Sequence, residues 1–235
     1  MNENNTSLAI KYFSDNFSMD VLMENTKPLN KEEKLALYYF NSFIEISNVF
    51  DRLIRYETFF EKFYPPKESK ISESEVVEYH LRSYIQDFYL LQERIKTITN
   101  KLTKDLKNYH ISNHEDVKNA LKHLPTIFYE KFNKITVDLR GEHVHVRSFT
   151  EFDLVKGKTL HSMIYDEEGI YNFDEKTKSI MGQKLKEVVN YSKDKHIKQS
   201  RKNSENLKEM KNWFSARFLY IFASLNGHKV QDLKF

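Results

Sequence analysis

The chain has 235 residues and a formal net charge of +3, and charged residues make up 30% of it. It contains no cysteine, which excludes a disulfide framework, a thiolate nucleophile and a cysteine-based zinc site. Five glycines and four prolines are typical of long helices, and 18 phenylalanines with 14 tyrosines supply ample volume for a core. The composition therefore indicates a folded, mainly helical protein, whose mild positive charge permits contact with nucleic acid without requiring it.

We expect a single cytoplasmic domain over residues 1–235, with no membrane segment and no cofactor. The first residues, 1–6, lack the basic region and apolar run of a secretory signal. The densest apolar stretch near the C-terminus, residues 218–225, is far shorter than the ~20 residues that span a bilayer. No stretch rich in glycine and proline divides the chain.

Three helical segments are predicted in the N-terminal half. Residues 1–29 contain a short amphipathic stretch, which we expect to form a helical arm packed on the body. Apolar residues recur at spacings of three and four over residues 31–63, until two consecutive prolines end the pattern. A second long helix is predicted for residues 72–107, because Ser72 and Glu75 form a capping-box pattern ahead of another apolar stripe. The short connection between the two long helices predicts that they lie antiparallel.

The C-terminal half predicts two more helices separated by an insertion. One helix is predicted over residues 113–139, and Pro125 is expected to kink it or to restart it. The pattern loosens over residues 150–173, which indicate a small inserted β-hairpin or ordered loop. The last helix begins between residues 174 and 183 and continues to about Leu225. The predicted fold is all-α: a four-helix up-and-down bundle with an N-terminal arm and the inserted hairpin or loop.

The last helix is polar over residues 190–206, where its apolar stripe should continue. One interpretation is that the helix projects into solvent there. The other is that the polar side chains face a wet pocket shared with the motif described next, with basic side chains contacting phosphate at its edge. His196 and Arg201 are the candidate substrate-binding residues of this stretch. The polar and basic positions are Ser192, Lys193, Lys195, His196, Lys198, Gln199, Arg201, Lys202 and Asn203.

Chemistry-bearing side chains are concentrated in residues 139–149. Imidazole titrates near neutrality and can move a proton either way, while guanidinium stays cationic and binds a phosphate through two hydrogen bonds. Together these groups suit phosphoryl-transfer chemistry. The side chains concerned are Arg140, Glu142, His143, His145 and Arg147.

The geometry of this motif depends on where the third helix ends. If the helix continues, Arg140 and His145 lie about 140° apart around its axis and do not share a face. Gly141 could break the helix and let them converge, or a second protomer could supply the missing partner. If residues 142–149 are extended instead, both histidines and the following arginine point to one side, with neighbours about 6.6 Å apart.

Two other interpretations of the motif remain open. The His-x-His pair with Glu142 could bind zinc or manganese, given a further ligand from elsewhere in the chain. Alternatively, these residues only cap a helix and form surface ion pairs. The histidines available as further metal ligands are His110, His114, His161 and His196.

Arg140 and His145, with four residues between them near the end of a predicted helix, resemble the motif of the HEPN superfamily. The resemblance implies a four-helix bundle and a homodimer that places two motifs in one cleft. It also implies metal-independent cleavage of RNA and employment in toxin–antitoxin or antiphage defence systems, where a neutralising or regulatory protein is a further partner. The chain departs from the family at Gly141, where members commonly carry a polar residue, often asparagine.

The expected reaction is attack of the ribose 2′-hydroxyl on the adjacent phosphate, which requires RNA. His145 is the expected general base or acid, and Arg140 is expected to bind the phosphate and stabilise its developing charge. His143 is the alternative base, Glu142 orients an imidazole, and Arg147 provides a second phosphate contact. The competing functions are a non-catalytic helical binding or regulatory protein of a defence or phage-related system, and a metal-dependent hydrolase built on the histidines.

Overall fold

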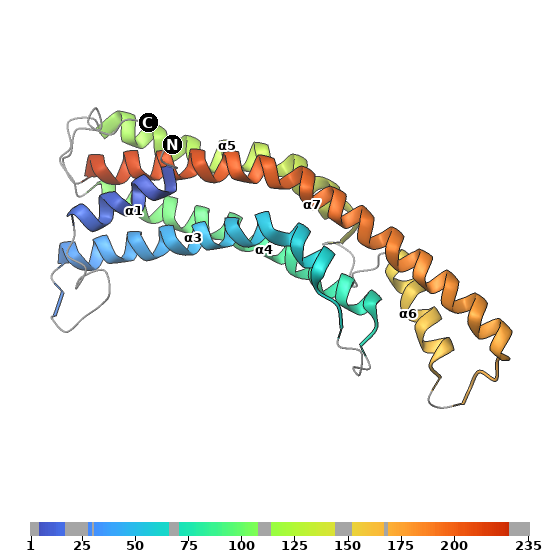
Figure 1. Cartoon of the computed structure of the whole chain (residues 1–235). Helices are drawn as coiled ribbons and strands as arrows, with labels where there is room; N and C mark the ends of the chain where they lie inside the picture. The colour runs from blue at the N-terminus through green and yellow to red at the C-terminus, as the bar shows by residue number, and fades with distance from the viewer. Residues whose placement is uncertain are drawn as a thin grey trace. The chain divides into compact units, whose positions relative to one another are not determined.

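The computed structural model describes residues 5–16, 28–29, 31–65, 71–107, 114–143, 152–166 and 169–225, with side chains for all of these except residues 31, 32, 114, 134–143 and 225. All regular secondary structure in these ranges is helical (Figure 1). None of the helices in the described ranges has the length and apolar character needed to span a bilayer. The helices are α1 (Asn5–Asn16), α3 (Lys31–Lys62), α4 (Glu73–Leu106), α5 (His114–His143), α6 (Phe152–Ile164) and α7 (Glu175–Leu225).

Local capping interactions fix where two of the long helices begin. At the start of α4, the Ser72 amide donates to Glu75 Oε2 at 2.7 Å, and the Glu75 amide donates to Ser72 Oγ at 3.2 Å. This confirms the capping box predicted from the sequence, because each side chain satisfies a backbone N–H of the other. At the start of α7, Asp174 Oδ1 accepts from the Thr177 amide at 2.6 Å, so Asp174 is the N-cap of that helix.

The chain divides into two compact units, and α3, α4, α5 and α7 contribute residues to both. Unit 1 comprises residues 1–52, 88–134 and 205–235, and unit 2 comprises residues 53–87 and 135–204. Within each unit, α3 and α4 are antiparallel, as predicted. In unit 1, Tyr39 pairs with Asp105 and Glu45 with Arg94. In unit 2, Tyr56 pairs with Asp87, and the ring of Phe60 contacts that of His80. The single domain predicted from the sequence stays a prediction.

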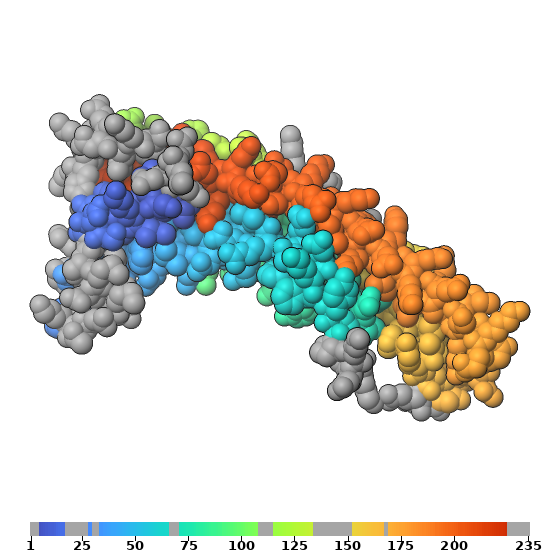
Figure 2. Space-filling view, viewed as in Figure 1, coloured from blue at the N-terminus to red at the C-terminus, as the bar shows by residue number. Residues whose placement is uncertain are grey.

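Unit 1 is built around stacked aromatic rings. Phe43 of α3 lies 5.1 Å from Phe218 of α7, centroid to centroid. The arm α1 covers this layer, because Phe13 stacks 4.5 Å from Phe222 of α7, and the space-filling view shows α1 against α3 (Figure 2). The hydroxyls of Thr6 and Ser215 share a hydrogen bond of 3.0 Å beside it. Thus residues 5–16 form the packed helical arm that the sequence predicts for residues 1–29.

Pro125 lies inside α5 and does not divide the helix, so the predicted restart at this residue is wrong. Proline removes one backbone hydrogen bond, and packing of the apolar face on either side of it compensates for the loss. That face is buried before and after the proline, and Phe128 stacks 4.3 Å from Phe132. Its buried residues are Val117, Leu121, Leu124, Phe128 and Phe132.

The insertion differs most from its prediction, since residues 152–164 form helix α6 and no β-hairpin or loop. Leu154 and Gly157, three residues apart, are buried on one face of α6. A Cβ atom added to Gly157 would clash with the Ser74 hydroxyl and lie 3.2 Å from Ser74 Cβ. The lack of a Cβ atom at Gly157 therefore lets α6 approach α4 closely. Beyond α6, Gly169 adopts φ +70°, a conformation that favours glycine.

The contact of Gly157 with Ser74 predicts that Gly157→Ala destabilises the protein by about 1–3 kcal/mol, through overpacking. Ser74→Ala removes the clashing hydroxyl and is expected to cost little, since that hydroxyl has no hydrogen-bond partner among the described residues. The double variant should then recover much of the lost stability. Urea unfolding of the three variants measures this coupling, and additive effects would contradict the contact.

Candidate functional site

The predicted catalytic motif begins at the C-terminal end of α5, in unit 2. Arg140, Glu142 and His143 belong to the last turn of this helix, which ends at His143, but their side chains are not among those described. His145 and Arg147 lie outside the described residues. The motif is thus helical over residues 140–143. The approach of Arg140 to His145 stays a prediction.

The two substrate-binding candidates of α7 point in different directions. His196 is buried, with 7% of its surface exposed, and its ring stacks 5.5 Å from that of Phe60. Arg201 faces solvent and forms an ion pair of 2.7 Å with Glu57 of α3, and 64% of its side chain is exposed. The structure therefore does not bring these two side chains together, and their contact with a substrate stays a prediction.

The polar stripe of α7 lies in the interior of unit 2, so the interpretation that it projects into solvent is wrong. Ser192 and Ser200 are buried, and Asn203 donates from Nδ2 to the Tyr84 hydroxyl at 3.1 Å. These small side chains continue the buried face of α7 at helical spacing. Gln199 in turn donates to Asn203 Oδ1 at 3.1 Å.

This polar network extends into a pair of buried tyrosines. The rings of Tyr56 and Tyr84 lie 4.8 Å apart, and the Tyr56 hydroxyl donates to Asp87 Oδ2 at 3.0 Å. Burial raises the pKa of Tyr84, and the hydrogen bond from Asn203 offsets only part of that effect. Tyr84 is therefore a neutral phenol at physiological pH. The network fixes the register of α7 against α3 and α4, since buried polar groups are stable only with their partners in place.

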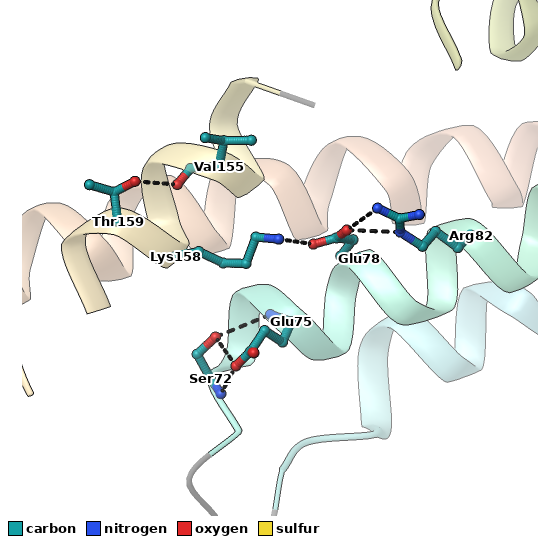
Figure 3. Close-up of polar contacts among 7 residues, drawn as sticks. All are labelled: Ser72, Glu75, Glu78, Arg82, Val155, Lys158 and Thr159. Atoms are coloured by element: carbon teal, nitrogen blue, oxygen red, sulfur yellow. Dashed lines mark hydrogen bonds and ion pairs between the residues drawn. The ribbon is translucent and has the colours of Figure 1, made fainter. Parts of the chain in front are cut away.

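A second polar cluster joins α4 to α6 in unit 2 (Figure 3). Glu78 accepts from Arg82 Nε at 2.8 Å and from Lys158 Nζ at 2.6 Å. Burial alone would raise the pKa of Glu78, but its hydrogen bonds and ion pairs with Lys158 and Arg82 outweigh burial and lower it. Glu78 is thus an ionised carboxylate that holds α6 onto the first turns of α4.

Sequence reasoning missed this cluster, although half of it has a local signal. Glu78 and Arg82 stand at the i,i+4 spacing of helical ion pairs, so their contact could have been predicted. Lys158 lies in α6, which was expected to be a hairpin or loop, and therefore gave no signal. The buried tyrosine network was missed for a related reason, because its partners come from three helices.

His80 of α4 lies among four aromatic rings of unit 2. Its ring centroid is 6.1 Å from those of Phe59, Phe60 and Phe63 and 5.6 Å from that of Tyr79. Burial lowers the pKa of His80, because the charged imidazolium loses hydration.

Within the described ranges, no group of three or more histidine, aspartate or glutamate side chains is arranged to hold a metal ion. The motif's Glu142, His143 and His145 lie outside that search, since their side chains are not described. No protein-family model, curated protein or solved structure matches the chain significantly. The assignment of the site therefore rests on the residues of this chain alone.

The lowered pKa of His80 predicts that stability decreases with acidification below about pH 6.5, the usual pKa of histidine. The folded state favours the neutral ring, so the unfolded state takes up a proton first, and the free energy of unfolding falls as pH falls. His80→Phe should flatten this part of the pH profile measured by urea unfolding. His123→Gln, at an exposed position of α5, serves as the control and should leave the profile unchanged.

The ion pairs of Glu78 predict that Glu78→Gln lowers the free energy of unfolding by about 1–2 kcal/mol, because three charge-assisted hydrogen bonds are weakened. Glu93→Gln changes a solvent-exposed pair with Lys96 and should cost less than about 0.5 kcal/mol. Chemical denaturation of both variants gives the comparison. Equal losses would show that the α4–α6 cluster contributes no more than a surface pair.

Proposed function

We propose that the chain is a HEPN-like endoribonuclease that cleaves RNA through its 2′-hydroxyl without a metal ion. One observation carries the proposal: Arg140 lies in the last described turn of α5, the helix in which the resemblance places the motif. His145 lies outside the described residues, so its approach to Arg140 is part of the proposal. The all-helical described chain also agrees with this fold class.

In the proposed reaction the 2′-oxygen attacks phosphorus, and the bond from phosphorus to the 5′-oxygen of the next nucleotide breaks. The products are a 2′,3′-cyclic phosphate and a 5′-hydroxyl. His145 accepts the proton of the 2′-hydroxyl or protonates the leaving oxygen, and Arg140 neutralises charge on the non-bridging oxygens. His143 is the alternative base, Glu142 orients an imidazole, and Arg147 adds a second phosphate contact.

The finer architecture belongs to the same proposal. A four-helix bundle that pairs with a second copy would place two Arg140 and His145 pairs in one cleft, and one copy could then supply the group that the other lacks. Such a nuclease would act as a toxin or antiphage component held in check by a neutralising protein. The chain departs from the family at Gly141, because members commonly carry a polar residue at this position.

A second candidate function is a non-catalytic binding or regulatory protein. It is favoured by the distribution of exposed large apolar side chains, since all those in the described residues except Ile10 and Tyr129 belong to unit 2. Exposed apolar groups gathered in one part of a protein mark contact surfaces for partners. The exposed residues of unit 2 are Phe63, Tyr64, Ile71, Tyr79, Phe152, Val155, Tyr165, Ile170, Tyr171, Ile180 and Tyr191.

Incubation with single-stranded RNA in excess EDTA tests the proposed nuclease. We expect wild-type protein to cleave RNA and to leave DNA of the same sequence intact, because DNA lacks the nucleophile. Arg140→Ala and His145→Ala should each lower the cleavage rate by about 100-fold or more, as expected for loss of a charge-stabilising or proton-transferring group. Gel electrophoresis with end-group analysis for a cyclic phosphate measures both rate and product.

Lys122→Ala, at an exposed position of α5, is the matched control and should cleave RNA like wild type. Cleavage that EDTA abolishes and zinc or manganese restores would point to the metal-dependent alternative. Absence of cleavage by folded wild-type protein would contradict the proposal and favour the binding protein.

A further inference from the structure

Four aromatic residues form a continuous cluster in unit 2, at the end of α3 and the start of α4. The ring centroids of Phe59 and Phe63 lie 5.5 Å apart, those of Phe63 and His80 6.1 Å, and those of Tyr79 and His80 5.6 Å. Phe63 is 55% exposed and Tyr79 is 68% exposed, whereas Phe59 and His80 are half-buried. These four residues are called the aromatic cluster below.

The inner rings hold the outer rings in place. His80 lies between Phe63 and Tyr79 and also contacts buried Phe60, which stacks on His196 of α7. The exposed rings therefore extend outward from the packed interior and are not isolated side chains on a surface. A flat ring whose orientation is fixed by its neighbours loses little conformational entropy when a ligand stacks on it.

A lysine side chain lies over the ring of Tyr64, the residue that follows Phe63 in the chain. Tyr64 follows Phe63 directly and is itself exposed, and Lys193 Nζ lies 3.9 Å from the centroid of its ring and also contacts its hydroxyl. Arg201, two helical turns further along α7, forms an ion pair with the carboxylate of Glu57. Exposed rings beside a lysine match the two parts of a nucleotide, because the base stacks on a ring and the phosphate attracts a cation.

We propose that the aromatic cluster binds single-stranded nucleic acid, with bases stacked on Phe63 and Tyr79 and Lys193 contacting a phosphate. Stacking uses the face of the base, which every nucleotide has, so binding should tolerate changes of sequence. It also does not use the ribose hydroxyl, so RNA and DNA should both bind. The proposed binding uses none of the residues of the proposed cleavage motif and does not depend on catalysis.

Fluorescence anisotropy with labelled single-stranded DNA of mixed sequence, about ten nucleotides long, tests this proposal. DNA cannot be cleaved through a 2′-hydroxyl, so failure of binding and failure of the nuclease are observed separately. Phe63→Ala and Tyr79→Ala should each weaken binding by at least about fivefold. Tyr129→Ala removes an exposed aromatic ring from unit 1 and should bind like wild type. Lys193→Gln should reduce the dependence of affinity on salt concentration.

Conservative variants separate stacking from general apolar contact. Phe63→Tyr keeps an aromatic face and should bind like wild type, whereas Phe63→Leu keeps apolar volume without that face and should bind weakly. Wild-type binding by Phe63→Leu, or an equal loss in Tyr129→Ala, would overturn the proposal. Absence of DNA and RNA binding by the wild-type protein at micromolar concentration would also overturn the proposal. This holds even if Phe63→Ala changes the oligomeric state. Circular dichroism verifies folding, and Tyr79→Ala decides the matter if Phe63→Ala does not fold.

Discussion

One face of α7 supplies interior residues to both units, and the rest of the described structure is built against it. In unit 1 this face carries bulky apolar residues such as Phe214 and Phe218, which stack on the rings of α3. In unit 2 the same face carries Ser192, Ser200 and Asn203, which are also buried. In unit 1, α7 therefore packs against α3 by ring stacking, and in unit 2 it contacts α4 through the side-chain amide of Asn203.

The buried face of α7 is apolar in unit 1 and polar in unit 2. This difference determines which contacts the interior of each unit needs. Buried rings need only shape and volume, and the stacked layer of unit 1 supplies both. Buried hydroxyls and amides also need hydrogen-bond partners, because an unpaired polar group in the interior costs free energy. Tyr84 meets this need for Asn203, and Tyr56 directs its own hydroxyl to Asp87. Unit 2 thus depends on a specific register between helices, whereas unit 1 depends mainly on volume.

The features that could be predicted from the sequence are those encoded locally. Ser72 and Glu75 lie three residues apart and cap α4 without help from the rest of the chain, so the start of that helix was predictable. Helix α6 was not, because the close contact of Gly157 with Ser74 joins residues that are far apart in the chain. The burial of the polar face of α7 could not be predicted either, because the partner of Asn203 is Tyr84, on another helix.

The prediction of function from the sequence is also limited to features that are encoded locally. Arg140 and His145 were found because both lie in one short stretch, and their side-chain geometry depends on contacts that a short stretch does not encode. The aromatic cluster had no sequence signal, since Phe63 and Tyr79 lie on different helices and are joined through His80. Yet both sets belong to unit 2, which also holds most of the exposed large apolar side chains of the described residues and the hydrogen bond between Asn203 and Tyr84. Exposed rings and buried polar groups are departures from what stability alone favours, and such departures are expected where a protein binds or reacts.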